Sequence, residues 1–70
     1  MPMTPKEMTR FLKKNKFQKV DGGKGGHQKF YNPKSNRTTE VPMHNRDLTK
    51  GEEHDILKQA NLLEEYRKNK

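Results

Sequence analysis

The chain contains no cysteine, which excludes disulfide bonds and any metal site built on thiolate ligands. Its three histidines, at positions 27, 44 and 54, lack the close spacing of a preassembled zinc site. No apolar run approaches the roughly 20 residues that a membrane-spanning helix needs, and no segment reads as a secretory signal. We therefore expect a cytoplasmic protein with no membrane contact, no metal and no cofactor.

Hydrophobic residues are scarce, at 26% of the 70-residue chain, whereas 36% of the residues are charged. Such a composition approaches that of disordered chains, which bury too little apolar surface to fold. The apolar residues nevertheless recur at regular spacings, which indicates a single small domain with a thin core.

Acidic residues are too few to balance the basic ones. Sixteen lysines and arginines face nine aspartates and glutamates, so the net charge is +7. This excess favours a polyanionic partner, first nucleic acid, then an acidic protein, and last an anionic membrane. We expect a diffuse basic surface that holds phosphates without reading bases. Its expected members are Lys13, Lys14, Lys16, Lys19, Lys34 and Arg37.

Two helices are predicted, one near each end of the chain. Residues 4–7 (TPKE) match a capping box with proline at the first helical position. Apolar residues at helical spacing continue this helix to residue 15 or 16. Residues 49–52 (TKGE) match a second capping box. Asn61 either ends that second helix in the left-handed conformation or lies inside a longer helix.

Three short runs between the helices are typical of strands. They span residues 17–20, 27–31 and 37–41, and dense turn signals separate them. This pattern predicts an α+β fold of order α-β-β-β-α, with a three-stranded antiparallel sheet and both helices on one face. Residues 1–62 would form this single domain. Residues 63–70 would be a charged extension of the second helix or a frayed tail.

A glycine-rich segment, residues 22–31 (GGKGGHQKFY), carries the most specific signal in the sequence. Four glycines in five positions precede His27, and glycine lets a ligand's backbone approach closely. Strand alternation would place His27, Lys29 and Tyr31 on the open face of the sheet and Phe30 toward the helices. The segment lacks the ending of a nucleotide-binding P-loop, and it could also be a flexible hairpin connection.

The residue types of this glycine-rich segment suit the cleavage of RNA. A base must take the proton of the ribose 2′-hydroxyl, and a free imidazole, with a pKa near 6.5, is largely neutral near neutral pH. Ammonium groups can stabilise the charge that gathers on the phosphate. His27 is therefore the candidate catalytic residue, although a surface histidine ending a turn is the alternative. The candidate RNA contacts are Lys24, Gly25, Gly26, Lys29 and Tyr31.

Other chemical roles are less specific. The group that protonates the leaving 5′-oxygen is either Tyr31 or a lysine, and Tyr31 could instead stack on a base or be an ordinary strand residue. His44 is expected to be structural, at the corner between the third strand and the second helix. His54 is expected to be a solvated helix residue.

The sequence resembles a known family, the HicA toxins of bacterial toxin–antitoxin pairs. The resemblance rests on residues 25–33 (GGHQKFYNP), 38–39 (TT), 41–44 (VPMH) and 56–62 (ILKQANL). It implies a fold similar to a double-stranded-RNA-binding domain, mRNA interferase activity, and silencing by a HicB antitoxin. Gly26 stands where the family usually has serine, and Asn61 stands where it usually has glycine.

The resemblance implies the toxin of a type II system, a metal-independent endoribonuclease that cleaves mRNA with His27. The alternative is a non-catalytic basic RNA-binding module that docks on the A-form minor groove by shape. A DNA-binding protein is a weaker alternative, because the chain offers no recognition helix. The implied partners are mRNA and a HicB-like antitoxin, which would cover the positive sheet face or insert acidic groups near His27.

Overall fold

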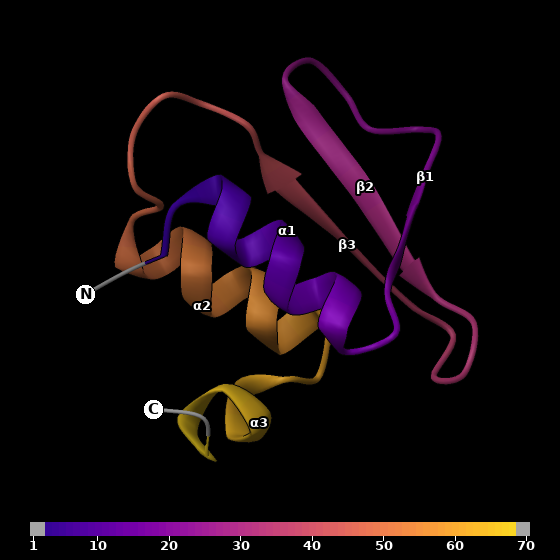
Figure 1. Cartoon of the computed structure of the whole chain (residues 1–70). Coiled ribbons are helices and arrows are strands. Elements are labelled where there is room, and N and C mark those ends of the chain that lie inside the picture. The colour runs from indigo at the N-terminus through magenta and orange to yellow at the C-terminus, as the bar shows by residue number, and fades with distance from the viewer. Residues whose placement is uncertain (1–2, 69–70) are drawn as a thin grey trace.

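The computed structural model of the chain describes residues 3–68, and residues 1–2 and 69–70 lie outside this description. The elements follow the order α1 (Pro5–Lys14), β1 (Gln18–Val20), β2 (His27–Asn32), β3 (Arg37–Pro42), α2 (Lys50–Gln59) and α3 (Leu63–Lys68). The strands form one antiparallel sheet in the order β1-β2-β3 (Figure 1). The predicted α+β fold is confirmed, and its order is consistent with a double-stranded-RNA-binding domain.

Both α1 and α2 begin at the capping boxes that the sequence predicts. The Glu7 N–H donates to the Thr4 hydroxyl at 3.1 Å, and the Thr4 N–H donates to the Glu7 carboxylate at 2.9 Å. Thr49 and Glu52 repeat this reciprocal pair at the same two distances. Each box satisfies backbone N–H groups that have no partner inside the helix.

The end of α1 is a Schellman motif, in which Lys16 takes a left-handed φ of 76°. The Phe17 N–H donates to the Leu12 carbonyl at 3.0 Å, and the Lys16 N–H donates to the Lys13 carbonyl at 3.2 Å. These bonds satisfy carbonyls at the helix end. Phe17 therefore belongs to the helix cap, and β1 begins one residue later than the sequence predicts.

The end of α2 is a second Schellman motif, with Asn61 at a left-handed φ of 60°. The Leu62 N–H donates to the Leu57 carbonyl at 2.8 Å. Asn61 therefore ends the helix, the first of the two conformations expected for it.

Residues 63–68 correct the expectation for the end of the chain, because they form the separate helix α3. They are neither an extension of α2 nor a frayed tail. The ring of Tyr66 meets the ring of Phe11 edge to face, with 5.7 Å between centroids, so α3 folds back onto α1. Residues 69 and 70, which belong to the same expectation, lie outside the described residues.

The core lies between one face of the sheet and the helices α1 and α2 (Figure 1). Its buried hydrophobic residues are Met8, Leu12, Phe17, Phe30, Val41, Leu48, Ile56, Leu57 and Ala60. Thr39 is buried among them, and its hydroxyl donates to the Gln59 side-chain oxygen at 2.9 Å. This bond satisfies a polar group in an apolar setting. In residues 3–68, no helix is long and apolar enough to cross a membrane.

Phe30 is fully buried, as the strand alternation predicts. Its neighbours in β2 point the other way, because successive side chains of a strand alternate between faces. No described helix packs on that second face, which we call the open face. By strand register it carries Gln18, Val20, His27, Lys29, Tyr31, Thr38, Glu40 and Pro42.

Replacing Lys16 by glycine should stabilise the protein by about 1 kcal/mol, because glycine takes a left-handed φ without the steric penalty that a side chain meets. In thermal unfolding followed by circular dichroism, the midpoint should rise by about 4–8 °C. The matched variant Asn61→Gly should rise less, because asparagine tolerates this conformation better than lysine. An equal or larger rise in Asn61→Gly would contradict the argument.

Candidate active site

His27 is the first residue of β2 and closes a tight turn. Its N–H donates to the Lys24 carbonyl at 3.0 Å, and Gly25 within the turn has a left-handed φ of 59°. The Gly26 carbonyl accepts a hydrogen bond from the Met43 N–H at 2.9 Å. The imidazole is therefore fixed where the glycine turn meets the end of β3.

Gly23 and Gly26 differ in whether their surroundings leave room for a side chain. A Cβ on Gly23 would overlap the carbonyl oxygen of His27, so the loop backbone passes directly against the start of β2. A Cβ on Gly26 would meet no described atom within 4 Å. Gly23 is thus the glycine that close approach requires, and the sequence pattern did not distinguish it from its neighbours.

The imidazole of His27 lies on the open face, with 47% of its side chain exposed. Its Nδ1 atom is 3.3 Å from the Oε1 atom of Glu40. Pro42 pairs with His27 across the strands, and Glu40 is two residues before Pro42, so the contact is diagonal. Within residues 3–68, the Nε2 atom of His27 has no hydrogen-bond partner.

Glu40 is the residue of the site that the sequence analysis did not identify. The signal was the hairpin register, because the turn after Asn32 pairs Lys29 directly with Glu40. A carboxylate next to the candidate base changes what the imidazole can do.

Lys24 and Lys29 form no ion pair with any described residue, so both ammonium groups remain available to an anion. Lys29 lies two residues after His27 on the same face, roughly 7 Å along the strand. Its Nζ atom lies 3.6 Å from the position that a Cβ on Gly22 would take. The Lys29 side chain therefore extends over the glycine loop.

Tyr31 shares the open face but lies at the other end of β2. It is four positions after His27, which is roughly 13 Å along the strand. Its hydroxyl donates to the Asn36 side-chain oxygen at 2.9 Å, in the turn between β2 and β3. The backbones of Lys24, Gly25, Gly26 and Lys29 thus lie near that of His27, whereas Tyr31 lies apart from them. The Lys29 ammonium lies by Gly22, and the imidazole lies by Glu40.

An open groove of about 920 Å³ extends along β3 and α2, with His27 among its lining residues. Three carboxylates, those of Glu40, Glu52 and Asp55, line it together with Arg37. Carboxylates repel phosphate, so this groove is a poor site for an RNA backbone. The Lys29 ammonium lies instead by Gly22 of the glycine loop.

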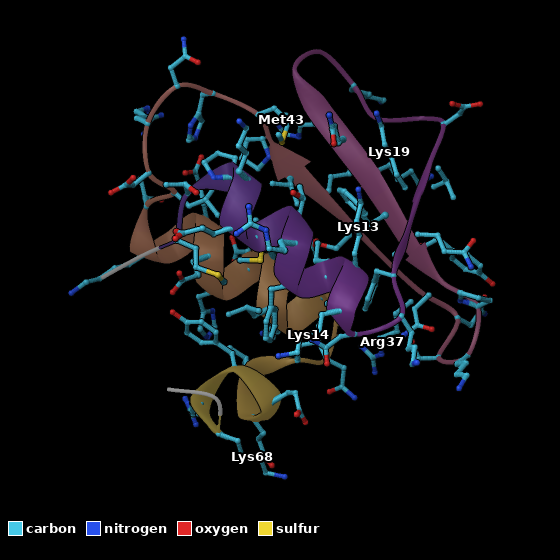
Figure 2. The ribbon with its side chains drawn as sticks, in the orientation of Figure 1. Lys13, Lys14, Lys19, Arg37, Met43 and Lys68 are labelled. Atoms are coloured by element: carbon cyan, nitrogen blue, oxygen red, sulfur yellow. The ribbon has the colours of Figure 1, made fainter. Side chains whose placement is uncertain are left out.

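Basic side chains elsewhere are distributed over several elements. Figure 2 shows Lys13 and Lys14 on α1, Lys19 on β1, Arg37 on β3 and Lys68 on α3. All five are exposed. The positive charge is therefore diffuse, as the sequence predicts. By strand register, the charged residues of the open face other than His27 are Lys29 and Glu40.

The other two histidines take structural or solvated positions. The Nδ1 atom of His44 lies 2.9 Å from the Arg46 carbonyl oxygen, and its Nε2 atom lies 3.4 Å from the Glu52 carboxylate. The backbone hydrogen bond from Thr49 lowers the pKa of Glu52, and His44 adds a smaller effect in the same direction. His54 is exposed on α2. In the part of the chain described, no three histidine or acidic side chains gather where they could hold a metal ion.

The fold and this site define a small basic α+β domain that presents an imidazole on the open face of its sheet. Residues 5–62 match the family described as "HicA toxin of bacterial toxin-antitoxin". The match covers most of the chain, and the chain belongs to the HicA toxin family of bacterial toxin–antitoxin systems. The resemblance seen in the sequence is confirmed. A search of curated proteins finds no significant match.

The two glycines give a matched test of the loop geometry. Gly23→Ala should lower the free energy of unfolding by about 1–3 kcal/mol, because its methyl group overlaps the His27 carbonyl. Gly26→Ala adds the same methyl group into open space, and it should be neutral or stabilise by up to about 1 kcal/mol. Urea unfolding measures both values. Equal losses in the two variants would show that the loop does not pass against β2 in this way.

Proposed function

We propose that this HicA-family protein is an endoribonuclease that cleaves mRNA without a metal ion, with His27 as its catalytic residue. One observation carries the proposal: in the described residues, an exposed imidazole has no partner on Nε2, and two lysines without ion pairs, Lys24 and Lys29, lie within three residues of it along the chain. Membership of a toxin family supports the same activity.

In the proposed reaction, Nε2 of His27 takes the proton of a ribose 2′-hydroxyl, and that oxygen attacks the adjacent phosphorus. The bond from phosphorus to the 5′-oxygen breaks, which leaves a cyclic phosphate and a free 5′-hydroxyl. Lys24 and Lys29 stabilise the charge on the phosphoryl oxygens. Tyr31 lies too far along β2 to act on the same phosphate, so a lysine is the better candidate for protonating the 5′-oxygen.

The glycine turn supports an RNA contact in a second way. Gly25 and Gly26 carry no side chain next to His27, and apart from each glycine's own chain neighbours no described atom lies within 4 Å of its Cβ position. An RNA backbone can therefore approach His27 closely over this turn. Phosphate contacts of this kind give little base specificity.

His27→Ala should lower the rate of RNA cleavage by about 10²- to 10⁴-fold, because it removes the general base. The matched control His54→Ala removes an exposed histidine from α2 and should cleave at the wild-type rate. Cleavage of a labelled RNA and growth after induction both report the effect, and RNA affinity should change little. Wild-type cleavage by His27→Ala would reject His27 as the catalytic residue, and an absence of cleavage by the wild-type protein would favour the non-catalytic RNA-binding module.

The partner we propose is a HicB-like antitoxin that covers the open face with acidic groups near His27. Attraction between opposite charges speeds such an encounter, and salt screens it.

The association rate with a HicB-type antitoxin should fall by about tenfold or more from low to high salt. Lys29→Gln should slow association at low salt, whereas Lys68→Gln, on the distant helix α3, should change it less. Stopped-flow mixing measures these rates. Faster association at high salt would contradict an interface on the positive face.

A further inference from the structure

The contact between β3 and the imidazole points to a second functional residue. We infer that Glu40 is a positioning residue, which holds the proton of neutral His27 on Nδ1 and so leaves Nε2 as the base. The inference rests on the proposed ribonuclease function, and it adds a carboxylate that neither the glycine segment nor the family resemblance indicates.

An ionised carboxylate only accepts hydrogen bonds, so the contact of 3.3 Å between Glu40 and Nδ1 is attractive only when Nδ1 carries a proton. A neutral imidazole has a single N–H. When that proton is on Nδ1, the lone pair is on Nε2, which is the nitrogen left without a partner in residues 3–68.

Glu40 is held in place for this role. It lies in β3 between Thr39 and Val41, both of which are buried in the core, so its backbone is fixed by the sheet. Lys29 is directly opposite in the register and could have neutralised it. The Lys29 ammonium lies over Gly22 instead, and among the described residues the ion partner of Glu40 is His27.

If Glu40 affected only the affinity for RNA, its removal would have the opposite effect to the loss of a positioning residue. A carboxylate beside a phosphate site repels the substrate, so its removal would strengthen RNA binding. A positioning role predicts slower chemistry instead, because the same carboxylate also stabilises the imidazolium that forms when Nε2 takes a proton. The effect should be modest, since 47% of the His27 side chain and 38% of the Glu40 side chain are exposed to water.

The tautomer can be measured directly on the full chain. Long-range proton–nitrogen correlation spectra of ¹⁵N-labelled protein, at a pH where His27 is neutral, distinguish the two N–H forms. Wild-type His27 should be mainly the Nδ1–H form, and Glu40→Ala should shift it toward the Nε2–H form that free histidine prefers. Glu40→Gln keeps an acceptor oxygen and should be intermediate. Asp55→Asn removes a carboxylate elsewhere in the groove and should match wild type.

Steady-state cleavage kinetics over a range of RNA concentrations give the second readout. Glu40→Ala should lower kcat by about two- to fivefold, with KM unchanged or lower, and Asp55→Asn should leave kcat unchanged. The thermal midpoints of all variants, measured in parallel, show that they are folded.

Two results would overturn the inference. One is the same tautomer in wild type and Glu40→Ala, and the other is a change of KM in Glu40→Ala with no change of kcat. A failure of the proposed function is distinguishable, because His27→Ala would then cleave as well as wild type. Loss of cleavage in His27→Ala, with no tautomer change in Glu40→Ala, rejects the positioning role alone.

Discussion

The burial of Phe30 against α1 and α2 is the constraint on which the rest of the structure depends. A strand has only two faces, so once Phe30 faces the core, the side chains on either side of it must face the other way. The core is thin and lies on one side of the sheet. His27 and Lys29 therefore share the open face because of the same packing that stabilises the domain.

This arrangement resolves a conflict between stability and function in a small chain. Hydrophobic residues are too few to cover both faces of a sheet, and the structure uses them on one. The other face carries polar and charged side chains at no loss of core packing. Such a face leaves His27 and Lys29 accessible to the RNA substrate and to the antitoxin that we propose.

Backbone turns and helix caps also position the site. The Schellman motif at Lys16 directs Phe17 into the core and starts the sheet, and the close passage of Gly23 over the start of β2 orients the glycine turn. The Gly26 carbonyl then joins the turn to the end of β3. These are backbone contacts, so the position of the imidazole depends on the path of the main chain.

The sequence by itself determined the order of elements, both helix starts, the left-handed option at Asn61 and the exposed position of His27. All of these follow from chemistry within a few neighbouring residues: capping boxes, turn residues and the two-residue alternation of a strand. Only the tertiary structure decided that Glu40, thirteen residues away, reaches the imidazole and that Tyr31 does not. It also decided that Gly23 is the glycine that the close backbone approach requires, and that residues 63–68 fold back as α3. These features depend on strand register and on the path of the chain in space, which residue spacing along the sequence does not specify.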